Sequence, residues 1–210
     1  MARPALPRPC LMLVTDRRVC EGPLEEVVAR AVEAGVDAVQ VREKDLPARD
    51  LLDLCMRLRA VTLGRALLLV NDRADVALAC GADGVHLGEQ SLPTRAVRWL
   101  VGEDRLVGRS VHSPEGAEQA EKEGADYLVL GTLFPTESHP GAPAGGLALL
   151  NEVTRRVRIP VLGIGGITPE KVPFLLQARA WGVAVIRGVL AQPDPAEAVR
   201  RFREALRWGR

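Results

Sequence analysis

The chain has 210 residues, 47% of them hydrophobic, and its 28 basic and 27 acidic side chains leave a formal net charge of +1. Single domains commonly reach about 250 residues before they divide, so we expect one domain over residues 1–210. The balanced charge offers no excess field for nucleic acid or an anionic membrane, which leaves small molecules as the expected partners. Assembly into a homo-oligomer is left open.

Residues 1–10 contain three prolines and two arginines, and we expect them to form a loosely ordered N-terminal extension. No apolar run is long enough for a signal peptide or approaches the roughly 20 residues that span a bilayer. The four cysteines, Cys10, Cys20, Cys55 and Cys80, form no CxxC pair. We therefore expect reduced, mostly buried thiols in a cytoplasmic protein.

Short apolar runs rich in Val and Leu alternate with stretches that have helical spacing, which predicts parallel strands covered by helices. The eight expected strands are 11–15, 38–42, 66–71, 84–87, 106–111, 127–131, 161–165 and 183–186. Helices are expected over 23–34, 48–61, 114–123, 148–156, 169–178 and 196–208. Ser113 and Thr168 each precede a Pro-Glu pair, which predicts hydroxyl N-caps.

Eight such units in about 200 residues predict an α/β fold of one domain, the (β/α)8 TIM barrel near its lower size limit. The sequence Gly-x-Asp recurs before three strands, beginning at Gly35, Gly81 and Gly124, and a fourth copy carries Trp181 in place of Asp. The rival architecture is a doubly wound sheet. Its dinucleotide fingerprint would follow the first strand, where Asp16 and two arginines stand instead.

Binding groups of a TIM barrel follow the C-terminal ends of its strands. After the second strand, Gln40, Arg42 and Lys44 share one face of an extended chain. Arg and Lys at this position could hold a phosphate or pyrophosphate. The alternative is a solvated charged turn in which they pair with Glu43 and Asp45.

The next three strands also end in polar side chains. Asn71 and Asp72 follow the third strand, where the Asp is a candidate to bind Mg²⁺ or to orient a ligand amine, or else an ordinary helix-entry cap. His86 in the fourth strand can be an interior histidine with its hydrogen bonds satisfied. Ser110 in the fifth strand is expected to point into the site, and the role of His112 is undecided.

Residues 132–146 form the longest irregular segment, and such Pro- and Gly-rich loops above a barrel commonly act as lids. His139 on this loop could be a general acid or base, or an exposed histidine without a role. Thr136 and Ser138 of the same loop are expected to contact the substrate.

Glycines gather at the ends of the last two strands. Gly165 and Gly166 follow the seventh strand and Gly188 follows the eighth, so backbone N–H groups can approach an oxyanion closely. Arg187 could add positive charge or point outward. These residues predict the phosphate-binding site.

These motifs resemble, in order along nearly the whole chain, the superfamily of thiamine-phosphate synthases and TenI-like thiazole tautomerases. The matches include QVREKD at 40–45, VNDR at 70–73, GADGVHLG at 81–88 and GIGGI at 163–167. Synthases join hydroxymethylpyrimidine diphosphate to thiazole phosphate, release pyrophosphate and use Mg²⁺. The resemblance implies that Gln40 contacts the pyrimidine, that Arg42 and Lys44 contact the pyrophosphate, and that Ser110 lies at the reacting centre.

Two departures from the synthase pattern favour the tautomerases. Ser91 stands where synthases carry an aspartate that binds the metal, and Ser138 and His139 stand where they carry a lysine. The tautomerase, an isomerase without a cofactor, binds the same thiazole phosphate and aromatises a thiazole carboxylate phosphate by proton transfer. Thr132 occupies the position of its usual catalytic histidine, so His139 and Ser110 are expected to be the catalytic residues.

Segments 91–93, 108–113 and 118–123 also look like those of the tautomerases. Our expectation is therefore a thiazole tautomerase of thiamine biosynthesis. The alternative is a thiamine-phosphate synthase, a transferase with Mg²⁺ at Asp72, since the chain retains Gln40, Arg42, Lys44 and Asp72. A second alternative is a non-catalytic regulator that binds a phosphorylated ligand. The chain has no helix-turn-helix pattern, which argues against DNA binding.

Overall fold

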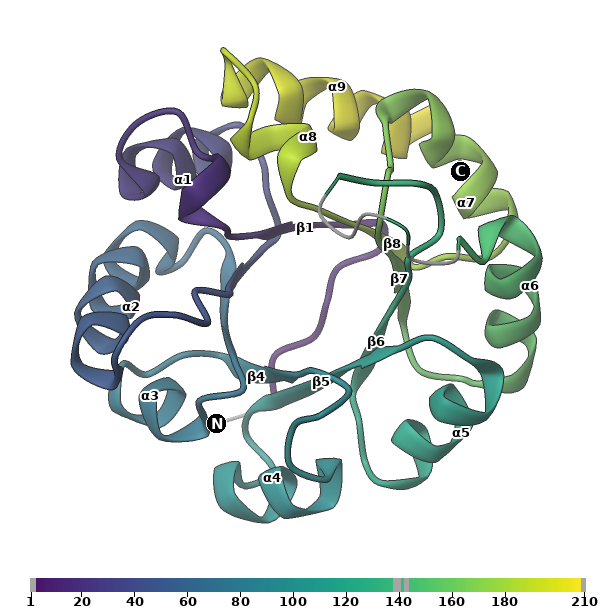
Figure 1. Cartoon of the computed structure of the whole chain (residues 1–210), viewed down its shortest axis with the longest axis horizontal. Coiled ribbons are helices and arrows are strands. Elements are labelled where there is room, and N and C mark those ends of the chain that lie inside the picture. Colours follow the sequence, from purple (N-terminus) through teal and green to yellow (C-terminus); the bar gives the residue numbers. More distant parts are fainter. Residues whose placement is uncertain (1–2, 138–140, 142–143, 209–210) are drawn as a thin grey trace.

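The computed structural model describes residues 3–137, 141 and 144–208. Eight parallel strands form a closed barrel in chain order, and helices surround it on the outside (Figure 1). The barrel closes because β1 (Cys10–Val14) pairs with β8 (Gly182–Val185) as well as with β2 (Ala38–Val41). The TIM-barrel prediction is confirmed, and the doubly wound sheet is excluded because that sheet has open edges.

The remaining strands are β3 (Leu67–Asn71), β4 (Gly84–Leu87), β5 (Leu106–Val111), β6 (Tyr127–Leu130) and β7 (Val161–Gly163). The longer helices are α1 (Leu24–Glu33), α2 (Ala48–Thr62), α4 (Thr94–Val101), α5 (Pro114–Lys122), α6 (Gly146–Arg156) and α9 (Pro195–Trp208). The shorter ones are α3 (Ala74–Ala79), α7 (Val172–Gln177), α8 (Arg187–Leu190) and the 3₁₀ turns η1 (Arg17–Val19) and η2 (Pro169–Lys171). The predicted strands all exist, with ends that differ by at most two residues.

Capping residues behave differently at two helix starts. Ser113 Oγ accepts a hydrogen bond from the Gly116 N–H at 3.1 Å, which confirms the predicted cap of α5. Thr168 makes no such bond, and the helix predicted over 169–178 is divided into η2 and α7. Pro173 lies at the start of α7, where it has no N–H to continue an α-helical ladder from η2.

The glycine-aspartate repeat ties each strand to the one before it. In all three copies the glycine has a positive φ, and the aspartate accepts a hydrogen bond from the second residue of the preceding strand at 2.7 or 2.8 Å. The bonded pairs are Asp37 with Leu11, Asp83 with Leu68 and Asp126 with Val107. The repeat therefore stabilises the N-terminal end of the barrel, away from the strand ends where ligands bind.

The segment 3–9 closes this N-terminal end, although the sequence predicted a loose extension there. Leu6 is 6% exposed and belongs to the apolar cluster inside the barrel. Trp181, at the fourth copy of the repeat, donates its indole N–H to the Pro7 carbonyl at 2.9 Å and lies against the Arg8 guanidinium. Figure 1 shows the purple chain crossing the barrel before it enters β1.

Two apolar clusters hold the fold together. One fills the barrel interior and includes Met12, Val14 and Leu162; the other lies between the strands and the surrounding helices. The four cysteines are free thiols, and three of them are buried, as expected. Within the described ranges, no helix has the length and apolar character needed to cross a bilayer.

Candidate functional site

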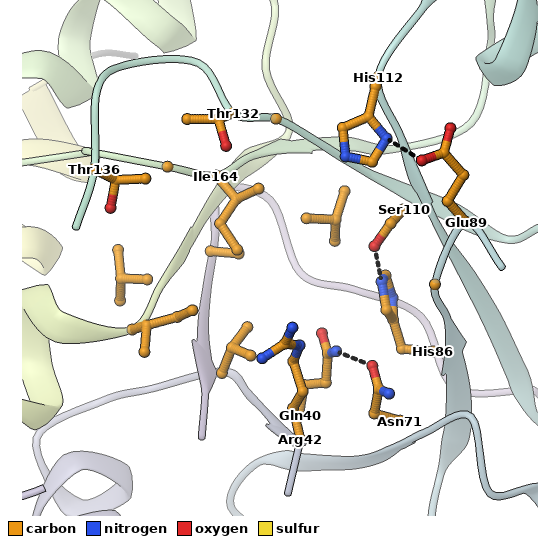
Figure 2. A pocket seen from close by; sticks show the side chains of 18 of the residues that line it. Gln40, Arg42, Asn71, His86, Glu89, Ser110, His112, Thr132, Thr136 and Ile164 are labelled. Carbon is orange, nitrogen blue, oxygen red and sulfur yellow. Dashed lines mark hydrogen bonds and ion pairs between the residues drawn. The ribbon is translucent and has the colours of Figure 1, made fainter. Parts of the chain in front are cut away.

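The C-terminal ends of the strands open into a cavity of about 940 Å³ (Figure 2), a volume that suits a small-molecule ligand. The candidate residues that the structure describes all line this cavity: Gln40, Arg42, Lys44, Asn71, Asp72, Ser110, Thr136, Gly165, Gly166, Arg187 and Gly188. Two candidates, Ser138 and His139, lie outside the described residues. The structure therefore does not place the expected catalytic base.

The cations after β2 are available to a ligand. Glu43 is buried and Asp45 is exposed, and both carboxylates pair with Arg17 at 3.0 and 2.7 Å. The hydrogen bond from Arg17 lowers the pKa of Asp45, which keeps it ionised. No carboxylate of the described chain pairs with Arg42 or Lys44. Because Glu43 and Asp45 pair with Arg17, they are not the partners of Arg42 and Lys44. The prediction of a charged turn is therefore wrong.

A buried amide pair lies beside these cations. Gln40 is 2% exposed and donates its Nε2 hydrogen bond to Asn71 Oδ1 at 3.1 Å, while Asn71 Nδ2 donates to Asp72 Oδ2 at 2.8 Å. Gln40 Oε1 is buried and has no hydrogen-bond partner within the described chain, while the Gln40 side chain lines the cavity (Figure 2). Buried polar atoms are nearly always paired, so this acceptor calls for a donor group on a ligand.

Asp72 has the left-handed backbone conformation, with a φ of 61°, which is uncommon for residues other than glycine and clusters at functional sites. Its Oδ1 accepts hydrogen bonds from the Gly88 N–H at 3.1 Å and from the Ser91 hydroxyl. Asp72 is thus an anchor for the β4–α4 loop as well as a candidate metal ligand.

Arg109 holds the same loop from β5. Its guanidinium donates to the carbonyls of Glu89 and Leu92 at 3.0 and 2.9 Å, on either side of Ser91. His112 lies at the mouth of the cavity, where its Nδ1 is 3.6 Å from the Glu89 carboxylate (Figure 2). The loop that carries Ser91 is therefore contacted by three residues outside it, Asp72, Arg109 and His112.

His86 lies at the base of the cavity with both ring nitrogens hydrogen bonded. Nδ1 is 3.0 Å from the Tyr127 hydroxyl, and Nε2 is 2.9 Å from Ser110 Oγ. Burial is the main cause that lowers the pKa of His86 to about 3, so the ring is neutral at physiological pH. The prediction of an interior histidine with satisfied hydrogen bonds is confirmed.

Glycine is required at the rim formed by β7. Gly165 and Gly166 have φ angles of 97° and 59°, and a Cβ on Gly166 would lie 2.3 Å from the Pro135 carbonyl oxygen. Their backbone N–H groups, like that of Gly188, have no acceptor among the described residues. Lys171 Nζ donates to the Gly166 carbonyl at 2.5 Å and so supports the turn.

Arg187 contacts the loop that follows β6. Its guanidinium is 2.8 Å from the Glu137 carboxylate, and the Arg187 side chain is partly exposed while it lines the cavity. The Glu137 carboxylate is therefore the ion-pair partner of Arg187. The Arg187 side chain lines the cavity with its charge balanced by Glu137, and its role in binding a phosphate stays a prediction.

Sequence reasoning missed Tyr127, Arg109 and Glu137. The sequence contains a signal for Tyr127, because Gly108 lies inside a predicted strand. A glycine at such a position often marks the close approach of another side chain. Arg109 and Glu137 had none, because their contacts join segments that are distant in sequence.

The fold and the cavity define a (β/α)8 barrel with two cations, Arg42 and Lys44, that pair with no carboxylate of the described residues. A glycine rim, formed by Gly165, Gly166 and Gly188, lies at the C-terminal ends of β7 and β8. A family model described as thiamine monophosphate synthase matches residues 11–189. A putative thiamine-phosphate synthase of Geobacter sulfurreducens is 47% identical over 195 residues, which cover 90% of this chain and 91% of that protein. A thiamine-phosphate synthase of Roseiflexus castenholzii is 45% identical over 196 residues, covering 92% and 86%.

The solved structure of thiamine phosphate pyrophosphorylase from Pyrococcus furiosus has a TM-score of 0.88 to this chain at 38% identity, with 96% of each chain covered. The chain therefore belongs to the thiamine monophosphate synthase family.

The prediction of a thiazole tautomerase is wrong, because these extensive likenesses are to proteins named as synthases. The local segments that suggested it have structural roles. Arg109 holds the β4–α4 loop, and Gly108 makes room for Tyr127, whose ring a Cβ there would overlap. In the segment 118–123, Glu121 accepts hydrogen bonds from the backbone before β7 and Glu123 accepts one from the start of α4.

Proposed function

We propose that this chain is a thiamine-phosphate synthase, a transferase that joins hydroxymethylpyrimidine diphosphate to thiazole phosphate and releases pyrophosphate. One observation supports the proposal: a single cavity is lined by two separate groups of candidate anion-binding residues, which follow different strands. Arg42 and Lys44 lie after β2, while the N–H groups of Gly165, Gly166 and Gly188, which have no acceptor among the described residues, lie after β7 and β8. Two phosphorylated substrates require two sites for phosphate groups, whereas the tautomerase substrate carries a single phosphate together with a carboxylate.

The buried amide pair suits the pyrimidine. The unpaired Gln40 Oε1 would accept a hydrogen bond from the ring's exocyclic amino group, while Asn71 holds the Gln40 side chain in place. A neutral acceptor that would otherwise be buried without a partner discriminates strongly for a ligand that supplies a donor. This contact would place the pyrimidine between the cations of β2 and Ser110.

In the coupling step, the pyrimidine methylene carbon exchanges its bond to a diphosphate oxygen for a bond to the thiazole ring nitrogen. Arg42 and Lys44 would stabilise the charge that grows on the departing pyrophosphate. The glycine rim would hold the thiazole phosphate and so orient the ring nitrogen towards the carbon. Val129 and Ile164 line the cavity and would limit the access of water to the reactive carbon.

Asp72 and Ser91 offer two neighbouring oxygen ligands to the Mg²⁺ that such synthases use. Among the described residues no group of three or more His, Cys, Asp or Glu side chains could hold a metal. Mg²⁺ commonly takes one or two carboxylates together with substrate phosphates and water, so these residues fit an ion bound jointly with the diphosphate. When bound, Mg²⁺ would supply charge that neutralises the leaving group.

Calorimetric titration with Mg²⁺ tests this fit. Wild-type protein should bind Mg²⁺ more tightly in the presence of pyrophosphate than alone. Ser91→Asp should raise the affinity for Mg²⁺ alone by roughly tenfold or more, because it adds a second hard anionic ligand beside Asp72. Ser91→Ala serves as the control and should give no gain. Equal Mg²⁺ affinity of the Asp and Ala variants would show that residue 91 does not face the ion.

The proposed activity is tested by incubating purified protein with both substrates and Mg²⁺ and measuring thiamine phosphate and pyrophosphate by chromatography. The two products should appear in equal amounts, and omission of thiazole phosphate should remove both. Binding of each substrate by calorimetry without product formation would overturn the proposed function.

A further inference from the structure

Three neighbouring strands bring two rings together inside the barrel. In the strand register, His86 of β4 is opposite Gly108 of β5, and Gly108 is opposite Tyr127 of β6. A Cβ at Gly108 would lie 2.0 Å from Tyr127 Cζ, so the missing side chain leaves the space in which the rings meet. The ring centroids of His86 and Tyr127 are 5.6 Å apart.

The burial of Tyr127 determines which atoms donate in this chain of hydrogen bonds. Its side chain is fully buried in the apolar cluster of the barrel interior, and in the described structure its hydroxyl has His86 Nδ1 as its hydrogen-bond partner. If Nδ1 carried the proton and donated, the phenolic O–H would be buried without an acceptor, which is costly. The phenol therefore donates to Nδ1.

The position of the imidazole proton also determines the direction of the hydrogen bond to Ser110. A neutral imidazole carries one proton, so an Nδ1 that accepts leaves the proton on Nε2. Nε2–H then donates to Ser110 Oγ across the 2.9 Å contact. Ser110 lines the cavity and is partly exposed, and its own O–H remains for an acceptor within the cavity.

We propose that Tyr127 and His86 are positioning residues that make Ser110 a hydrogen-bond donor to an anionic oxygen of the ligand. The direction of these hydrogen bonds distinguishes this arrangement from the one that activates a nucleophilic serine. In a Ser-His-Asp triad the acid accepts from Nδ1–H, so Nε2 is free to take the serine proton. Here the third residue is a donor, Nε2 is protonated, and it cannot accept that proton.

The identity of the ligand oxygen rests on the proposed function, under which it belongs to the diphosphate. The Ser110 O–H would donate to an oxygen that gains charge as the bond to the methylene carbon breaks. A donor held in place before the reaction stabilises that charge without reorganisation, so its loss should lower kcat more than it raises KM.

Nitrogen-15 NMR of histidine-labelled, ligand-free protein tests the direction of the bonds without any turnover. The chain has three histidines, and the signals of His86 are those lost in His86→Gln. We expect a protonated Nε2 and an unprotonated Nδ1 in the wild type, and a mixture of both neutral tautomers in Tyr127→Phe. A wild-type His86 with the proton on Nδ1 would overturn the proposal. Because the spectrum needs no substrate, failure of the proposed function leaves this result interpretable.

Kinetics test the consequence for Ser110. Tyr127→Phe and His86→Asn should each lower kcat by roughly 10- to 100-fold with KM nearly unchanged, since either change disturbs the donor at Nε2. His86→Gln, whose amide nitrogen can reach the Nε2 position, should recover most of the activity. Thr62→Val is the matched control, because it removes another fully buried hydroxyl, on α2 away from the cavity.

Thr62→Val should lose thermal stability much as Tyr127→Phe does and keep its kcat. Equal kcat values for these two variants would mean that the Tyr127 hydroxyl contributes only to stability, and the positioning role would be wrong. A low kcat in His86→Gln, equal to that of His86→Asn, would likewise contradict it.

Discussion

Replacement of Arg42 by methionine is expected to lower kcat/KM for the pyrimidine diphosphate by roughly a thousandfold, which is about 4 kcal/mol of transition-state stabilisation. The Arg42 side chain lines the cavity without a described carboxylate partner, so its charge is available to the substrate. Methionine keeps much of the length and apolar contact of the side chain. Steady-state release of pyrophosphate measures the change, and KM for thiazole phosphate should move little.

Arg49→Met is the matched control. Arg49 is exposed in the first turn of α2, outside the cavity, and its side chain has no described ion-pair partner. Arg49→Met removes one positive charge, as Arg42→Met does, but it does not remove a group that faces the ligand. Similar losses in the two variants would mean that long-range charge, and not a direct contact, explains the effect of Arg42.

Gly166→Ala should raise KM for thiazole phosphate by roughly a hundredfold, about 3 kcal/mol of binding free energy, and should also destabilise the fold. The φ of 59° costs an L-residue about 1 kcal/mol. The added Cβ would lie 2.3 Å from the Pro135 carbonyl oxygen, so the β6–α6 loop or the turn at Gly166 must shift. Either shift moves the N–H groups that would hold the phosphate.

Gly81→Ala is the control that separates the strain of the positive φ from the steric clash of the added Cβ. Gly81 has a nearly equal φ of 64°, but no atom lies within 4 Å of the position of its Cβ, and it is at the other end of the barrel. This variant should lose about 1 kcal/mol of unfolding free energy and keep both KM values. If thiazole phosphate KM were unchanged in Gly166→Ala while stability fell as in Gly81→Ala, the glycine rim would not be the phosphate site.

The main error in the sequence predictions concerns the reaction, which was expected to be that of a thiazole tautomerase. The tautomerase prediction rests on two departures from the synthase pattern, Ser91 and the Ser138–His139 pair, and on three short segments. In the structure Ser91 donates to Asp72, so the hydroxyl still faces the candidate metal position from a loop that Arg109 holds. A local departure in one ligand does not outweigh a likeness to synthases that extends over nine-tenths of the chain.

Other residues show where sequence reasoning succeeded. The glycines at 35, 81 and 124 and their aspartates were placed at turns before strands because helix ends and tight turns need those residues locally. Gln40, Arg42 and Asn71 were assigned to the cavity because the C-terminal ends of barrel strands meet there. His86 was assigned to the interior, but neither of its partners could be identified.

The sequence by itself determined the barrel, its strand positions and the residues at the mouth of the cavity. The hydrophobic periodicity, the placement of glycines and the strand ends are local properties of the chain. The tertiary structure decided how these residues pair. Arg17 neutralises both acids after β2, and Tyr127 reaches His86 through the space left by Gly108. Such contacts depend on the closure of the barrel, which brings segments distant in sequence within hydrogen-bond distance, and that proximity cannot be read from a one-dimensional pattern.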